Sequence, residues 1–315
     1  MALERVTLTG ATGLIGRRLA QALGERGTEL TVLTRSPQAA SSALRDAVPS
    51  IEAAAWDPLR EPAPADALQG RDAVVHLAGE RVDQRWSKKA KRAIRESRVT
   101  GTANLIAGLA ACEPRPAALL CASGAGYYGA RGEEPLDEEA PPGHGFLAEV
   151  SAAWEAQAGG ARSLQMRVVR LRIGVVLAAH GGALARMLPP FRLGLGGPVA
   201  GGDQYLSWIA LDDLVALMVA ALEDDRFSGA INATAPEPVT NRQFARELGG
   251  ALRRPARLPV PALAVRALFG EMAQTVTTGA RVMPARALML GFQFRHPELG
   301  EALRATLGER AQRPS

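Results

Sequence analysis

The chain has 315 residues, of which 47% are hydrophobic and 22% charged, and this balance excludes an intrinsically disordered protein. Its formal charge of +5 suits a phosphate-bearing ligand, but neither zinc-finger spacing nor an RNA-recognition signature accompanies the charge, so we expect no nucleic-acid partner. No run of eighteen apolar residues occurs and no secretory signal is visible, so we expect no membrane partner and a cytoplasmic location. Cys112 and Cys121 are too few for a disulfide framework, which fits a reducing compartment.

Short apolar runs alternate with helical patterns through the first half of the chain. The runs that predict strands are Val6–Thr9, Leu30–Thr34, Ile51–Ala55, Ala73–Leu77, Ala118–Cys121 and Val168–Leu171. The clearest helical patterns cover Leu14–Glu25 and Lys88–Ala111. Alternation of this kind predicts an α/β fold of the Rossmann type, a doubly wound parallel sheet with helices on both faces.

The pattern changes after residue 171. Glycine and proline interrupt residues 174–198, a helical pattern returns at Asp212–Leu222, and a short strand is predicted at Ala230–Ala233. We therefore expect a smaller C-terminal lobe, on the substrate side, beside the Rossmann domain. The expected bounds are 1–176 with about 211–235 for the Rossmann domain, 177–210 and 236–307 for the lobe, and 308–315 for a frayed tail.

The strongest site signal is a glycine-rich loop, TGATGLIG, between the first strand and the first helix. Gly10 permits a sharp turn, Gly13 lets the backbone approach a pyrophosphate, and Gly16 lets the helix pack close to the strand. The helix N-terminus adds amide donors and the positive end of a dipole. A tight turn without a ligand is the alternative. The predicted dinucleotide-binding residues are Gly10, Thr12, Gly13, Leu14, Ile15 and Gly16.

The end of the second strand indicates which dinucleotide is bound. NAD sites place an acid there for the ribose hydroxyls, whereas NADP sites need a cation for the 2′-phosphate. The sequence has Thr34, Arg35 and Ser36 and no acid, so Arg35 can bind the phosphate and the two hydroxyls can add donors. This favours NADP(H) over NAD(H), with a plain surface arginine as the alternative.

The fourth strand is followed by small residues that let backbone lie against a cofactor. Leu77, Ala78 and Gly79 are therefore expected to line the crevice at the carboxyl ends of the strands. His76 ends an apolar strand, and we expect it to be packed and hydrogen-bonded rather than catalytic.

Several motifs together resemble the short-chain dehydrogenase/reductase superfamily, and within it the atypical extended branch labelled "epimerase family protein". The resemblance covers nearly the whole chain, and its most specific part is the run MLPPFRLGLGGP at residues 187–198. The other motifs that carry it are Gly10–Gly16, Leu77–Glu80, Glu96–Arg98, Gly126–Gly129, Arg172–Leu177 and Trp208–Ile209, with a small extra domain at about Leu258–Leu307.

The resemblance implies an extended Rossmann domain with NADP(H) in the crevice and a C-terminal lobe over the substrate. It also implies that Arg98 reaches the cofactor and that the backbone of Val176 touches its nicotinamide end. Members of the branch are named after nucleotide-sugar epimerases, and extended relatives are often dimers, so a homodimer is an open expectation.

The usual catalytic pair of the superfamily, Tyr-x-x-x-Lys, is missing. Gly145 stands where the tyrosine would be and Glu149 where the lysine would be. Three residues could move a proton instead: Ser123 after the fifth strand, and Tyr127 and Tyr128 in the loop that follows. The alternatives are loop capping for the serine and packing for the tyrosines.

Two further residues are predicted to contact the substrate. Arg192, in the family-specific run, could hold an anionic group, and Trp208 belongs to the same side. The acidic run Asp137–Glu139 is interpreted as a solvated loop, and Asp212 as the cap of the helix that follows it. No metal site is expected.

Two hypotheses follow for the function. The first is an NADP(H)-dependent oxidoreductase or epimerase that acts on a small polar, or nucleotide-linked, substrate. The second, which the missing pair supports, is a non-catalytic NADP(H)-binding protein that senses redox state or regulates a partner.

Overall fold

The computed structural model describes residues 3–45, 48 and 51–308. Its centre is a sheet of seven parallel strands in the order β11-β7-β5-β4-β1-β2-β3. The chain order reverses beside β1, as in a doubly wound sheet, so the predicted Rossmann-type fold is confirmed. The strands are β1 (Arg5–Thr9), β2 (Glu29–Thr34), β3 (Ile51–Ala55), β4 (Ala73–His76), β5 (Ala118–Gly124), β7 (Arg167–Ile173) and β11 (Gly229–Ala233).

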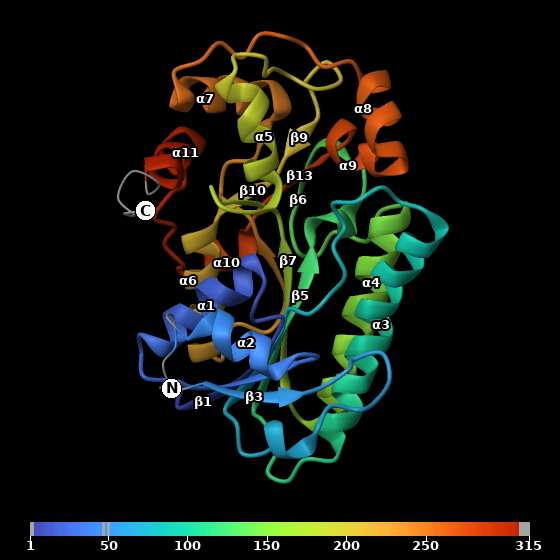
Figure 1. The fold of residues 1–315 in the computed structure, drawn as a ribbon, viewed down its shortest axis with the longest axis vertical. Helices are drawn as coiled ribbons and strands as arrows, with labels where there is room; N and C mark the ends of the chain where they lie inside the picture. The colour runs from blue at the N-terminus through green and yellow to red at the C-terminus, as the bar shows by residue number, and fades with distance from the viewer. Residues whose placement is uncertain (1–2, 46–47, 49–50, 309–315) are drawn as a thin grey trace.

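Helices cover both faces of the sheet (Figure 1). One face packs against α1 (Leu14–Gly24), α2 (Pro37–Leu44) and α6 (Leu211–Glu223) in the largest apolar core. The other face packs against α3 (Lys88–Ala110) and α4 (Phe146–Gly159) in a second core. Because both faces are covered, the central strands are buried throughout, which is why they read as continuous apolar runs.

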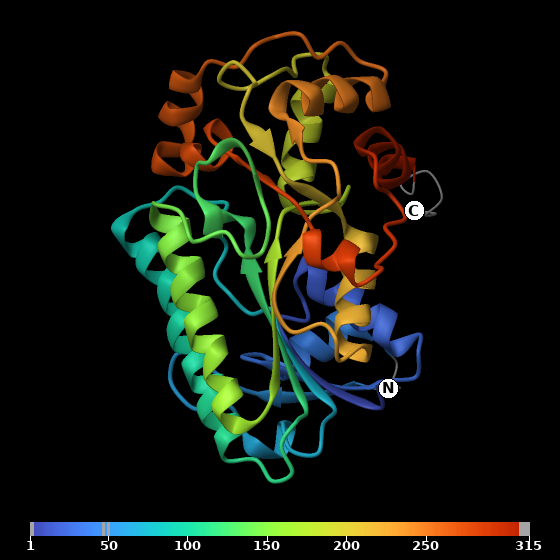
Figure 2. The ribbon, with the colours of Figure 1, turned by 180° about the vertical axis from the view of Figure 1, so that it is seen from behind.

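The C-terminal lobe stands over the carboxyl ends of the central strands (Figures 1 and 2). Its core surrounds Trp208 and Phe244. Its short strands form three two-stranded sheets, β8 with β10, β9 with β12 and β6 with β13. The strands are β6 (Gly132–Leu136), β8 (Val175–Leu177), β9 (Tyr205–Leu206), β10 (Trp208–Ala210), β12 (Val239–Thr240) and β13 (Ala280–Val282). The helices are α5 (Gly182–Arg192), α7 (Asn241–Leu252), α8 (Ala262–Phe269), α9 (Gln274–Thr277), α10 (Ala285–Met289) and α11 (Leu299–Gly308).

Four short 3₁₀ segments connect these elements in the described part of the chain. They are η1 (Ala65–Ala67), η2 (Ala125–Tyr128), η3 (Gly160–Leu164) and η4 (Gly270–Ala273). None of the described helices is both long and apolar enough to cross a membrane.

The structure refines three local features of the predicted elements. Within the stretch that glycine and proline interrupt, residues 182–192 form α5, and Pro189 and Pro190 lie in it although each lacks the N–H of one helical hydrogen bond. Ala210, not Asp212, caps α6; Asp212 lies in the first turn and its carboxylate accepts from Arg18 Nε at 2.8 Å. The expected tail mostly falls outside the described residues, since α11 ends at Gly308.

Candidate functional site

The glycine loop joins β1 to α1 at the carboxyl edge of the sheet. Gly10 has φ +71°, and a Cβ there would lie 2.8 Å from the carbonyl carbon of Leu77, so only glycine fits between the ends of β1 and β4. A Cβ on Gly16 would overlap the carbonyl oxygen of Gly10, which holds the helix close to the loop. Gly13 is the N-cap of α1 and no side chain caps the helix. The first-turn amides are therefore available to an anion.

A cavity opens beside this loop and brings together residues from four strand ends. Most of the residues predicted to bind the dinucleotide line it. Trp56 and Pro58 were not predicted; they follow β3 as Arg35 follows β2, and that position is the signal that could have identified them. The lining residues are Gly10, Ala11, Thr12, Gly13, Val32, Leu33, Thr34, Arg35, Trp56, Pro58, Leu77, Ala78 and Gly79.

Arg35 lies at the rim of this cavity, at the end of β2. It is exposed, and its guanidinium has no ion pair or hydrogen bond with any residue that the structure describes. No acidic residue lines the cavity in the described part of the chain. Ser36 does not line it and instead precedes α2 as its N-cap, with its amide donating to Thr34 Oγ1 at 3.3 Å.

Arg98 lies behind the cavity wall rather than in the cavity lining. Its Nη1 donates to the carbonyl oxygens of Glu80 at 2.9 Å and Ile94 at 3.1 Å, and the guanidinium stacks over Trp154 at 5.0 Å. A Cβ on Gly79 would lie 3.2 Å from its Cζ. Burial lowers the pKa of Arg98 to about 10. The Arg98 side chain therefore packs against the backbone of residues 79–80 on the side away from the cavity.

Val176, whose backbone the resemblance places at the nicotinamide end, lies in β8. Val176 is partly buried and pairs with Ile209 of β10. Leu14, in the first turn of α1, faces Gly181, since a Cβ on that glycine would lie 3.2 Å from Leu14 Cδ1. The start of α1 therefore contacts the segment that leads into α5.

His76 is packed and hydrogen-bonded, as predicted. Its side chain is fully buried, with Nδ1 2.8 Å from Thr9 Oγ1 and Nε2 3.1 Å from Thr102 Oγ1. Burial, reinforced by the charge of Arg98, lowers the pKa of His76 to about 4. The ring is therefore neutral near pH 7 and serves the packing between β1, β4 and α3.

A buried ion pair joins α4 to β7. Glu155 of α4 accepts from Arg172 Nε at 2.8 Å and from its Nη2 at 3.0 Å, and both side chains are at most 4% exposed. Arg170 approaches the same carboxylate at 3.5 Å. Burial opposes the charged form of Arg172, but Glu155 outweighs it and raises the pKa of the guanidinium.

Ser123 belongs to this pair rather than standing free. It lies opposite Arg172 in the β5–β7 register, and its Oγ donates to Glu155 Oε1 at 2.8 Å. The serine is 5% exposed. Because its proton is directed at the carboxylate, the hydroxyl can only accept a hydrogen bond from a substrate.

Tyr128 is fully enclosed, which argues against contact with a substrate. Its hydroxyl donates to Asn232 Oδ1 at 2.7 Å and accepts from Arg172 Nη1 at 2.8 Å. Burial raises the pKa of Tyr128 to about 12. Tyr128 therefore fits the alternative given above, a packing role rather than proton transfer.

Glu138 corrects the expectation that the acidic run is a solvated loop. Its side chain is buried, and Oε1 accepts from the amide of Asn232 at 2.9 Å. The amide of Arg286 also donates to this carboxylate, at 3.2 Å. Burial raises the pKa of Glu138. Asp137 and Glu139 are exposed as expected, so the prediction is wrong only at Glu138, which the tertiary structure encloses between β11 and α10.

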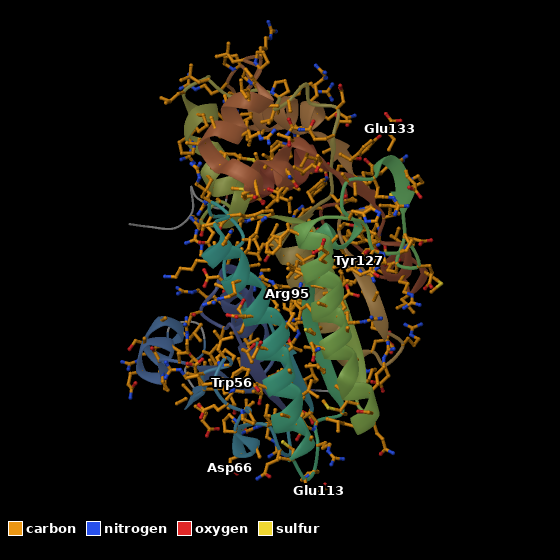
Figure 3. All side chains as sticks on the ribbon, turned by 90° about the vertical axis from the view of Figure 1, so that its right-hand side faces the viewer. Trp56, Asp66, Arg95, Glu113, Tyr127 and Glu133 are labelled. Carbon is orange, nitrogen blue, oxygen red and sulfur yellow. The ribbon has the colours of Figure 1, made fainter. Side chains whose placement is uncertain are left out.

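Tyr127 differs from Tyr128 in its surroundings. The guanidinium of Arg172 lies 3.6 Å from the centre of its ring, and the ring of Tyr128 packs edge-on at 5.2 Å. The Tyr127 hydroxyl has no hydrogen-bond partner among the described residues, and this oxygen is not buried without one. Figure 3 shows Tyr127 beside α4, with Trp56 lower in the view.

The two residues predicted to contact the substrate are not brought together. Trp208 is fully buried in the lobe core, and its Nε1 donates to the carbonyl oxygen of Glu237 at 3.0 Å, so its ring is closed to a ligand. Arg192 is exposed at the C-terminal end of α5. The substrate role expected for Trp208 is therefore not compatible with its burial.

Sequence reasoning missed Glu155, Arg172 and Asn232. All three are buried, and this burial is visible only when β7, β11 and α4 are packed. The spacing Arg170-x-Arg172 in a strand, which places both guanidiniums on one face, was the available signal.

A parallel sheet in this order, with a glycine loop at the start of the first helix, defines a Rossmann-type nucleotide-binding protein. A sequence model of the NAD dependent epimerase/dehydratase family matches residues 6–233, and a model of a domain of unknown function, DUF1731, matches residues 260–306. The chain belongs to the NAD dependent epimerase/dehydratase family and has its NAD(P)-binding fold.

Relatives from distant organisms align over nearly the whole chain. "Epimerase family protein SDR39U1 homolog, chloroplastic" of Arabidopsis thaliana is 42% identical, covering 96% of this chain and 86% of its own. "Epimerase family protein SDR39U1" of Homo sapiens is 37% identical, covering 95% and 98%. The family resemblance predicted from the motifs is thereby confirmed.

Solved structures agree with this assignment. The human SDR39U1 protein, solved with NADPH, superposes with a TM-score of 0.85 at 34% identity, covering 96% of this chain and 99% of that one. A nucleoside-diphosphate sugar epimerase from Corynebacterium glutamicum superposes with a TM-score of 0.77 at 35% identity, covering 98% of this chain and 59% of that one.

Proposed function

We propose that this protein is an NADP(H)-dependent oxidoreductase or epimerase that acts on a small polar, or nucleotide-linked, substrate. The observation that carries the cofactor assignment is Arg35, exposed and unpartnered within the described residues, on the rim of the cavity that the glycine loop also lines. The NADPH in the human relative supports the same choice.

The residues present fit this dinucleotide. The close approach at Gly10 and Gly16 leaves bare backbone where a pyrophosphate would lie, and the first turn of α1 supplies donors. Arg35 would bind the 2′-phosphate, with Thr34 beside it. The indole of Trp56 and the ring of Pro58 would wall the adenosine end. We assign Arg98 a supporting role behind Gly79.

When bound, the cofactor supplies or accepts a hydride. The chain's own contribution would be a proton, and we assign it to Tyr127. The arginines of β7 would stand in for the missing lysine, because Arg170 and Arg172 carry two positive charges against the single carboxylate of Glu155. The excess charge next to the phenol ring would stabilise negative charge as the hydroxyl gives up its proton.

Ser123 would orient the substrate instead of activating it. Since its proton is held by Glu155, its oxygen would accept from a substrate hydroxyl. The C-terminal lobe over residues 177–210 and 236–307 would close the substrate side, with Arg192 available for an anionic group at its surface.

A non-catalytic role is the second candidate, and one observation favours it. Gly145 and Glu149 occupy the positions of the catalytic pair, and Glu149 is an exposed residue in the first turn of α4. In that case bound NADP(H) would change the affinity for a partner or the oligomeric state. Oxidation of NADPH by a panel of carbonyl compounds would support the enzyme; binding without turnover, accompanied by a change in sedimentation, would support the sensor.

The cofactor assignment is tested by Arg35→Asp in calorimetry. Losing a charged hydrogen bond and adding a repulsive carboxylate should weaken NADPH binding roughly 10- to 150-fold. Binding of NADH should change much less. Arg45→Asp, an exposed arginine at the end of α2, is the matched control and should leave both affinities unchanged. Equal losses for NADPH and NADH in Arg35→Asp would remove the assignment.

We also propose a reducing compartment such as the cytoplasm, because Cys112 and Cys121 are both free and buried. The homodimer expected from the resemblance is kept as a proposal that sedimentation equilibrium tests.

A further inference from the structure

Helix α8 is attached to the rest of the protein by few of its side chains. Of its eight residues, all described, Val265 alone is buried, whereas Leu263 is 78% exposed and Leu268 is 67% exposed. A helix of this length is not stable by itself in water. Exposed apolar side chains that are grouped, rather than scattered singly, mark surfaces that bind a partner or a membrane.

The segment that follows α5 and the segment that leads into α8 lie at the same end of the molecule as α8 (Figure 1), and they carry three more exposed leucines. Leu193 is 74% exposed and Leu195 is 57% exposed, just beyond the end of α5, and Leu258 is 51% exposed. The two segments are joined, because the amide of Leu258 donates to Gly196 O at 3.3 Å and Val199 bridges Val260. We call these five residues the leucine surface: Leu193, Leu195, Leu258, Leu263 and Leu268.

The surroundings of the leucine surface are strongly basic. Residues 248–270 include four arginines and no Asp or Glu, and Arg192 adds a fifth next to Leu193. All five are exposed, and none forms an ion pair or side-chain hydrogen bond with the described residues. The acids that bound the segment, Glu247 and Glu271, are paired with Arg246 and Lys91. The arginines are Arg192, Arg253, Arg254, Arg257 and Arg266.

We propose that the leucine surface and its arginines bind the surface of a lipid bilayer that contains anionic lipids. Unpaired guanidiniums suit anionic headgroups, and the leucines can enter the hydrocarbon beneath them. A fluid hydrocarbon layer needs no matching shape, so it accepts side chains that project singly from α8 and from the neighbouring loops.

A second copy of this chain fits the same surface poorly. In a symmetric dimer the same patch meets itself, which would place five arginines against five arginines with no acid between them. The absence of an eighteen-residue apolar run excludes a spanning helix but not this contact, because a surface-bound segment needs only one apolar face.

The proposal is tested with the full chain in vesicle co-sedimentation. Phosphatidylcholine vesicles with phosphatidylserine should bind the protein, pure phosphatidylcholine vesicles should bind it far less, and added salt should weaken binding. Each of Leu263→Ser and Leu268→Ser should weaken binding roughly tenfold, because each removes one exposed leucine that would enter the hydrocarbon of the bilayer. Arg254→Glu and Arg257→Glu should also weaken it, by adding repulsion.

Matched controls separate this surface from general effects. Met289→Ser, at a side chain that is 75% exposed outside the leucine surface, and Arg115→Glu, near Glu113 at the opposite end of the molecule, should bind vesicles like the wild type (Figure 3). NADPH affinity should be unchanged in all variants, so failure here is distinguishable from failure of the cofactor assignment. Absence of vesicle binding, equal binding with and without phosphatidylserine, or self-association that Leu263→Ser abolishes would overturn the proposal.

Discussion

Glu155 and Arg172 form a bidentate ion pair that is almost wholly removed from solvent, with Nε–Oε1 at 2.8 Å and Nη2–Oε2 at 3.0 Å. The pair links α4 to β7. Ser123 is hydrogen-bonded to Glu155, and the guanidinium of Arg172 lies over the rings of both tyrosines of η2. The pair therefore has a structural role, and under the proposed mechanism it also supports Tyr127; measuring stability and turnover separates the two roles.

Breaking this pair should strongly destabilise the fold. Glu155→Gln keeps the shape but leaves the Arg172 charge buried without a carboxylate, and the expected loss is about 3–5 kcal/mol in the free energy of unfolding. Urea denaturation measures it. The control is Glu134→Gln at the more exposed pair with Arg131, where we expect less than about 1 kcal/mol. A loss at Glu155 no larger than at Glu134 would contradict the structural role of the pair.

Tyr127→Phe should slow turnover while leaving NADPH affinity close to that of the wild type. The phenyl ring keeps the contact with Arg172 but loses the proton, so the expected decrease in kcat is about 100-fold or more. Tyr128→Phe is the comparison: its hydroxyl is enclosed by Asn232 and Arg172, so the variant should lose stability first. Unchanged turnover in Tyr127→Phe, once an oxidisable or reducible substrate is found, would retire the tyrosine as proton donor.

Two glycines separate the effect of backbone strain at positive φ from the effect of a steric clash with neighbouring backbone. Gly10 and Gly27 both have positive φ, +71° and +81°, but a Cβ meets the backbone of Leu77 at Gly10 and open space at Gly27. Gly27→Ala should therefore cost only the conformational strain, about 1 kcal/mol, with NADPH affinity unchanged. Gly10→Ala should cost more and should also weaken NADPH binding. Calorimetry of both variants decides, and equal NADPH affinity in the two would contradict the assignment of this loop.

His76 should make stability depend on pH below neutrality. Its folded-state pKa of about 4 lies below the unfolded value of 6.5, so the unfolded state takes up the proton first and the free energy of unfolding falls as pH decreases through that window. The expected loss between pH 7 and pH 4 is about 3 kcal/mol. In His76→Gln this part of the decrease should be missing from urea titrations. An identical pH profile in the variant would show that His76 is not the source.

Much of the fold was readable from local pattern. All seven central strands begin and end within three residues of their predicted bounds, because strands buried on both faces stay apolar along most of their length. β5 and β7 run further than predicted, because the polar residues Ser123 and Arg172 interrupt the apolar pattern before each strand ends. The short strands of the lobe, with two to five residues each, carry too little pattern to be predicted.

The sequence by itself located the cavity beside the glycine loop, because the positions of Gly10, Gly16 and Arg35 depend on turn shape and strand ends, which local pattern encodes. Only the tertiary structure decided which polar residues are free. The hydroxyls of Ser123 and Tyr128 are hydrogen-bonded, whereas that of Tyr127 has no partner among the described residues. The reason is the ion pair beside them, which joins a helix and a strand that are distant in the chain. Burial of a charge is a property of the packed molecule, and no window of sequence contains it.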